Sequence, residues 1–150
     1  MKLAAAIAAL CCLALAACSD EDAQPQSTTL KRGSVDTTLA IGEPIDNYKP
    51  EGAKAAAGNH FAGFPLTWVD HGEPFPHEWA RFALVDDDGD RTTVSVLSPL
   101  TRTFPEKPQK GQPLRQVVAL QIADGRKPET LELSSATETW PFSAQFDVSN

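Results

Sequence analysis

Short runs in which apolar and polar residues alternate constrain the fold more than any other feature of the chain. Val35–Ile41 and Phe142–Val148 alternate, and Leu114–Ala123 is apolar at most positions. Alternation with a period of two is typical of strands that bury one face, whereas an almost continuous apolar run is typical of a central strand. Further strand-like runs are Trp79–Val85, Thr92–Leu97, Leu100–Phe104 and Thr130–Ser134. About seven short strands predict a mainly β fold, an antiparallel β-sandwich or small barrel.

Turn-forming residues separate these runs. Asp86–Arg91 (DDDGDR) lies between two strand-like runs and is typical of a β-hairpin. Glu51–Ala57 contains an alanine run and predicts at most a short helix, because Gly52 and Gly58 limit its length. Further turn or loop segments are Gly42–Pro50, Pro105–Pro113 and Asp124–Pro128.

The N-terminal segment differs from the rest of the chain. Lys2 carries its single charge, and Leu3–Leu15 is an uninterrupted apolar run that ends in Leu15-Ala16-Ala17-Cys18. The length of this run is typical of a secretory signal peptide and is too short for a comfortable transmembrane helix.

The last four residues of this segment resemble the lipobox of bacterial lipoproteins. The resemblance implies that residues 1–17 are removed as a signal peptide, that the Cys18 sulfur receives a diacylglyceryl group, and that the new amino group is acylated. Two or more acyl chains hold a protein firmly on a membrane. Ser19 resembles the residue of lipoproteins sent to the periplasmic face of the outer membrane. The alternative is an ordinary secretory signal, with Cys18 a free thiol.

Ser19–Ser34 (SDEDAQPQSTTLKRGS) has Leu30 as its single aliphatic residue. Such a segment cannot bury enough apolar area to offset the entropy lost on ordering. We therefore expect residues 18–34 to form a flexible lipidated tether and residues 35–150 to form one β-rich domain. All three cysteines lie at or before Cys18, so the mature chain has no pair to form a disulfide.

Charge and motif content favour a binding domain. Without residues 1–17, 12 Lys and Arg residues face 20 Asp and Glu residues, a net charge of −8, which argues against nucleic-acid binding. The sequence contains no Gly-x-Ser-x-Gly elbow and no phosphate-binding glycine loop. We expect a non-enzymatic lipoprotein without a cofactor that binds another envelope component as an accessory, adaptor or inhibitor.

The segment Phe61–Trp79 interleaves aromatic residues with Pro65, Pro74 and Pro76. This composition predicts a loop stiffened by proline, with at most a brief strand at Leu66–Val69. Rigid aromatic rings provide large contact areas at low entropic cost and could bind a partner. The alternative is a lid packed over one end of the sandwich. The candidate partner-binding residues are Phe61, Phe64, Trp68, Phe75 and Trp79.

All three histidines fall in one short stretch. Histidine and carboxylate side chains can hold zinc or copper, so the alternative function is a metal-binding protein or a small metal-dependent periplasmic enzyme. The spacings match no metal framework, and Arg81 stands where a metalloprotease helix needs its second histidine. The residues concerned are His60, His71 and His77, with Asp70, Glu73 and Glu78.

The acidic turn Asp86–Asp90 raises the possibility of calcium binding. With Gly89 as the glycine of an EF-hand loop, the first and twelfth ligand positions would fall on Leu84 and Ser95. Neither residue has a carboxylate, and Asp and Gly suit a hairpin turn without a metal. We therefore expect a plain hairpin turn there.

Overall fold

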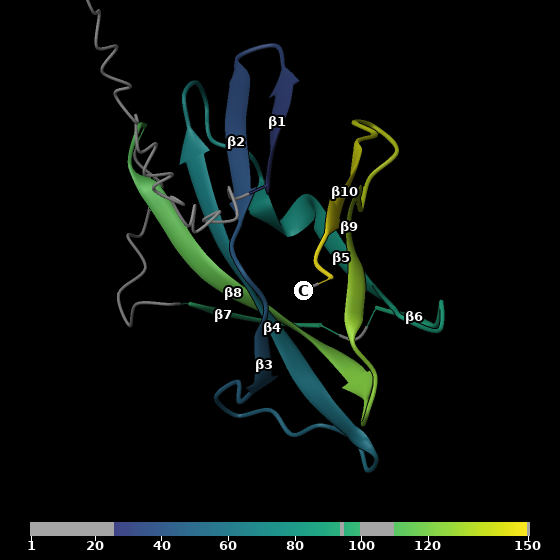
Figure 1. The fold of residues 1–150 in the computed structure, drawn as a ribbon. Helices are drawn as coiled ribbons and strands as arrows, with labels where there is room; N and C mark the ends of the chain where they lie inside the picture. The colour runs from purple at the N-terminus through teal and green to yellow at the C-terminus, as the bar shows by residue number, and fades with distance from the viewer. Residues whose placement is uncertain (1–25, 94, 100–109, 150) are drawn as a thin grey trace, which may run out of the picture.

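The computed structural model describes residues 26–93, 95–99 and 110–149, which form two antiparallel sheets that enclose a common core (Figure 1). The six-stranded sheet has the order β1-β2-β4-β8-β7, and β3 also pairs with β4. Its strands are β1 (Gln26–Arg32), β2 (Val35–Ile41), β3 (Ile45–Tyr48), β4 (Asn59–Asp70), β7 (Ser95–Pro99) and β8 (Pro113–Ala123).

The four-stranded sheet has the order β10-β9-β5-β6. Its strands are β5 (Ala80–Asp86), β6 (Arg91–Thr92), β9 (Pro128–Ser135) and β10 (Ser143–Asp147), and the 3-10 helix η1 (His77–Trp79) precedes β5. The predicted mainly β, antiparallel fold is confirmed, and its two sheets make it sandwich-like.

The hydrophobic core lies between the two sheets. Alternate residues of β4 place Phe64, Leu66 and Trp68 in this core, and β9 contributes Leu131 and Leu133. Because successive side chains of a strand point to opposite faces, residues two apart line one buried face. The core therefore depends on the longest strand of each sheet.

The strands predicted from clean alternation are confirmed. Strand β2 has the predicted bounds, and Thr37, Leu39 and Ile41 are its buried side chains. The apolar run that begins at Leu114 forms β8, which lies between β4 and β7 as predicted for a central strand. In β2, a one-residue shift in register would turn the buried face to solvent, so its alternating pattern specifies the register.

The prediction of a tether is wrong for residues 26–32, because Gln26–Arg32 forms β1. This strand pairs with the whole of β2, from Gln26 opposite Ile41 to Arg32 opposite Val35. Leu30 is its buried residue, whereas the remaining side chains are largely exposed at the edge of the sheet. The polar composition of the segment thus reflects an edge strand. Cys18 and residues 19–25 lie outside the described residues.

The prediction of a proline-stiffened loop is wrong for residues 61–70, since β4 continues unbroken to Asp70, whereas residues 71–76 lie outside any strand or helix, as predicted. Pro65 is tolerated because β2 has ended at Ile41 and the Pro65 carbonyl accepts a hydrogen bond from Gly42 at 2.8 Å. The N–H and C=O of a strand residue point to the same side, so the missing N–H of Pro65 falls in the gap between β2 and β3. Gly63 allows a close approach as well, because a Cβ atom there would lie 2.7 Å from Tyr48 Cγ.

Two further predictions are corrected. Glu51–Ala57 is turn and irregular structure, and Gly52 and Gly58 at its two ends have φ of 74° and 77°, values that do not continue a right-handed helix. The run Thr92–Leu97 divides between the sheets, because β6 pairs with β5 and β7 pairs with β8. Leu100–Phe104 and residues 105–109 lie outside the described residues.

Candidate functional site

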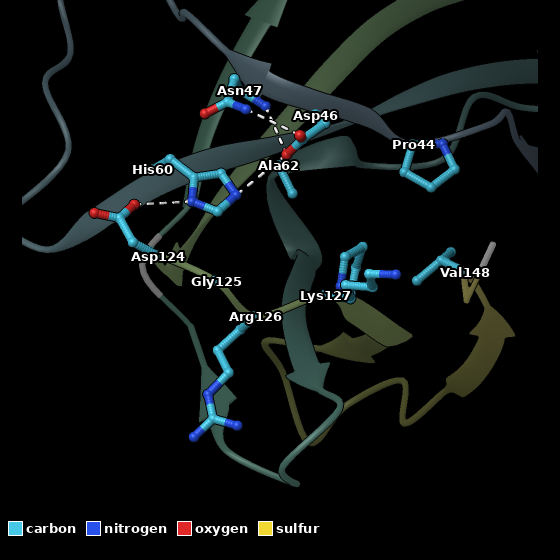
Figure 2. A pocket seen from close by; sticks show the side chains of 11 residues that line it. Pro44, Asp46, Asn47, His60, Ala62, Asp124, Gly125, Arg126, Lys127 and Val148 are labelled. Atoms are coloured by element: carbon cyan, nitrogen blue, oxygen red, sulfur yellow. Dashed lines mark hydrogen bonds and ion pairs between the residues drawn. The ribbon is translucent and has the colours of Figure 1, made fainter.

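A pocket of about 470 Å³ lies where the first part of β4 approaches the turn between β8 and β9 (Figure 2). It draws its lining from segments that are distant in the sequence. The loop before β3 and β3 itself form one side, the β8–β9 turn forms another, and a residue after β10 completes the wall. The lining residues are Pro44, Asp46, Asn47, His60, Ala62, Asp124, Gly125, Arg126, Lys127, Pro128 and Val148.

His60 is held between two carboxylates. Its Nδ1 lies 3.1 Å from Asp124 Oδ1, and its Nε2 lies 3.2 Å from Asp46 Oδ1. The imidazole is 18% exposed, whereas the side chains of Asp46 and Asp124 are 79% and 64% exposed. A neutral ring has one N–H to donate and a protonated ring has two, so the protonated ring donates to both carboxylates at once. His60 therefore ties the β3 segment and the β8–β9 turn to β4.

Asn47 fixes the Asp46 carboxylate. Its backbone N–H donates to Asp46 Oδ1 and its side-chain Nδ2 donates to Oδ2, both at 2.9 Å. Asn47 has φ of 50°, a left-handed conformation that asparagine adopts more readily than most residues. The carboxylate thus keeps its position beside His60 although it is largely exposed.

The β8–β9 turn contributes the basic groups, and the acidic hairpin turn positions them. The backbone N–H of Lys127 donates to Asp87 Oδ1 at 3.2 Å, and the Lys127 carbonyl accepts from the Asp87 N–H at 3.0 Å. Arg126 forms an ion pair with Asp88, and this hydrogen bond raises the pKa of the guanidinium above its ordinary value. Figure 2 shows Arg126 directed away from His60 and Lys127 directed toward Val148.

The hairpin predicted at Asp86–Arg91 is confirmed, because β5 and β6 pair on either side of it. Asp86 is buried, and its Oδ1 accepts the backbone N–H groups of Asp88 at 3.0 Å and of Asp90 at 2.9 Å. An aspartate that bonds to the backbone of its own turn stabilises that turn. The acidic residues therefore close the hairpin and dock it on the β8–β9 turn.

The three histidines proposed as metal ligands are not brought together. His60 and His71 lie at opposite ends of β4, about 35 Å apart along the strand at about 3.3 Å per residue. His71 is exposed, with its Nε2 3.1 Å from Thr38 Oγ1. His77 lies in η1, where its ring centroid is 4.8 Å from that of Trp68. Within the described residues, no group of three or more His, Cys, Asp or Glu side chains could hold a metal ion.

The carboxylates proposed to accompany these histidines have other contacts. Buried Asp70 accepts a hydrogen bond from Phe75 N at 3.3 Å and one from the Thr37 hydroxyl. Glu73 accepts a hydrogen bond from the Ser34 hydroxyl, and Glu78 is exposed. Burial lowers the pKa of His77, an effect opposed by the nearby charges of Asp70 and Glu78. These contacts anchor the chain between β4 and β5 to β2.

The aromatic residues proposed to bind a partner lie mostly in the interior. Trp68 stacks on Phe75 with ring centroids 5.6 Å apart, and half-buried Trp79 packs edge-on against Trp140 at 6.3 Å. The partner-binding prediction is wrong for the four buried residues, because their rings are covered within the fold. These are Phe61, Phe64, Trp68 and Phe75.

Sequence reasoning found His60 but missed the residues that surround it. Asp46, Asp124 and Lys127 lie in segments that the sequence marks only as turns. Turn residues carry no signal about which other turn they approach, so only the pairing of β4 with β3 and β8 brings them to His60.

No helix in the described part of the chain is long and apolar enough to cross a membrane.

Comparisons of this chain with protein-family models, with curated proteins and with solved structures find no match.

Proposed function

We propose that this chain is a lipid-anchored, non-enzymatic protein of the bacterial cell envelope that binds another envelope component in the pocket beside His60. The observation that carries the proposal is the pocket itself. Its volume of about 470 Å³ falls in the range of small-molecule sites. Apolar side chains line one part of it, and charged groups of both signs line the rest. Such a lining can orient a ligand while burying its apolar portion.

Binding is favoured over catalysis by the way His60 is held. A general base must reach the proton that it removes, but both ring nitrogens of His60 already face carboxylates. Among the described residues that line the pocket, none is a serine, threonine or cysteine, so the lining offers no hydroxyl or thiol nucleophile. The site therefore has groups to hold a ligand rather than groups arranged to transform one.

The membrane anchor rests on the lipobox at Leu15-Ala16-Ala17-Cys18. It is tested by mass spectrometry of the full-length protein from a bacterium that processes lipoproteins. We expect an acylated N-terminal Cys18 in the outer-membrane fraction, and a Cys18→Ala variant that is released from that fraction. An unmodified Cys18 in the wild-type protein would contradict the anchor and the localisation.

The binding role is tested by crosslinking in intact cells. A photoreactive amino acid at Pro44 would line the pocket, and the same amino acid at exposed Gln145 on β10 provides the control. We expect one envelope component to be captured from position 44 and not from position 145. Equal capture from both positions, or capture from neither, would contradict a binding function of the pocket.

A further inference from the structure

The pocket beside His60 separates its negative groups from the ammonium group of Lys127, which forms no ion pair with any residue in the described part of the chain. Asp46 and Asp124 flank His60 at one side, and both carboxylates stay mostly exposed. With His60 protonated the three side chains carry one net negative charge, and with His60 neutral they carry two. This side of the pocket is therefore negative in either state and suits a ligand ammonium group.

Lys127 supplies the positive side. Arg126 also lines the pocket, but its guanidinium is paired with Asp88 and points away from His60 (Figure 2). The Lys127 side chain is directed toward Val148, and its backbone is held by two hydrogen bonds with Asp87. The turn thus presents one ammonium group across the pocket from the two carboxylates.

Apolar side chains also line the pocket. They are Pro44, Ala62 and Val148, of which Ala62 and Val148 are buried. A ligand with a net negative charge would meet two carboxylates, and one with a net positive charge would meet Lys127. A neutral ligand with separated charges avoids both repulsions and gains two charge-assisted contacts.

We propose that the pocket binds a small zwitterion, with its ammonium group against Asp46 and Asp124 and its acidic group near Lys127. This inference rests on the proposed binding function and names the ligand class. An amino acid or short peptide has this chemistry, and so does a phosphodiester that carries an ammonium group, such as a lipid headgroup. The volume of about 470 Å³ accommodates a ligand of dipeptide size.

The test measures the affinity of the full-length lipoprotein in neutral detergent for four probes, by the shifts of its backbone amide resonances. Alanyl-alanine carries both charges, its N-acetyl form keeps only the carboxylate, and its C-terminal amide keeps only the ammonium group. Glycerophosphoethanolamine, a phosphodiester whose single negative charge balances its ammonium group, represents the headgroup source. We expect each zwitterion to bind at least about tenfold more tightly than either singly charged form, since a charge-assisted hydrogen bond is lost in each. Whichever zwitterion binds more tightly identifies the source, and either result supports the class.

Charge-neutralising variants assign the two sides of the pocket. Lys127→Gln should weaken alanyl-alanine about tenfold and should not weaken the amide form, whereas Lys127→Arg should retain the affinity. Asp124→Asn should weaken alanyl-alanine and should not weaken the N-acetyl form. Lys110→Gln, an exposed lysine beyond the opposite end of β4, provides the matched control. Thermal melting of each variant checks that it is folded.

Three results would overturn the zwitterion. They are equal affinity for singly and doubly charged probes, an unchanged affinity in Lys127→Gln, and no binding of any probe at millimolar concentration. The crosslinking from Pro44 remains a separate measure of the proposed function. Capture from that position without zwitterion binding would refute the ligand class alone, whereas loss of both would refute the binding site.

Discussion

Replacing Trp68 with alanine distinguishes a core aromatic from a partner-binding one. The Trp68 side chain is 2% exposed, stacks on Phe75 and donates its Nε1–H to Gln116 Oε1 at 3.2 Å. The indole thus fills the space between the sheets and satisfies a buried amide. A substitution at this position removes both contributions and opens a cavity.

The size of the effect follows from this burial. A tryptophan buries about 200 Å² of surface, which at about 25 cal/mol per Å² corresponds to about 5 kcal/mol. The unfolded chain already buries part of that area, and measured losses for tryptophan to alanine in cores are about 3 to 5 kcal/mol. Trp68→Phe should cost about 1 to 2 kcal/mol, because it keeps the stacking on Phe75 but leaves Gln116 without its donor.

Urea unfolding followed by circular dichroism measures these differences. With a slope of about 1.5 kcal/mol per M, Trp68→Ala should lower the midpoint by about 2 to 3 M. Ile45→Ala provides the control, since Ile45 is 40% exposed and should change the free energy of unfolding by less than about 0.5 kcal/mol. Equal midpoints for the Trp68 and Ile45 variants would refute the placement of Trp68 in the core.

Two further predictions test the N-terminal strand and the buried histidine. Leu30→Ala should lower the free energy of unfolding by about 2 to 4 kcal/mol because Leu30 is 5% exposed. Thr29→Ala, at an exposed position of the same strand, should change that free energy little. Equal free energies for the two variants in urea unfolding would indicate a tether instead of a strand. Burial lowers the pKa of His77 below its usual 6.5, so as the pH falls the unfolded chain takes up the proton first. The stability that neutral His77 contributes is complete above pH 6.5 and is lost as the pH falls below it. His77→Phe should therefore flatten the fall in the free energy of unfolding, measured by urea unfolding, between a pH of about 8 and about 5. An unchanged fall in the variant would exclude His77 as its source.

Strands with a regular apolar pattern were predictable because the rule behind them is local. Strand β2 was predicted with its observed bounds, and β8 was predicted as central. In each case the side chains that face the core repeat every second residue, and no knowledge of the partner strand is needed. The confirmed fold class follows from these elements.

Strands whose residue types suit their contacts with neighbouring strands, and not a regular apolar pattern, were not predictable in this way. Strand β4 contains Gly63 and Pro65, which are typical of loops, yet each suits its place. Tyr48 packs where a Cβ of residue 63 would lie, and Pro65 faces the gap after Ile41. Strand β1 has a single buried residue, Leu30, so its polar sequence is that of an edge strand and also that of a tether.

The candidate site shows the same division. The sequence alone determined a β-rich chain, the positions of its alternating strands and the hairpin at the acidic turn, because pleating and turn geometry act between residues close in the chain. Only the tertiary structure decided that the aromatic residues fill the core and that Asp46 and Asp124 meet at His60. The contact between His60 and Asp124 joins residues 64 apart in the sequence. Which strands pair depends on the packing of the whole chain rather than on any local pattern.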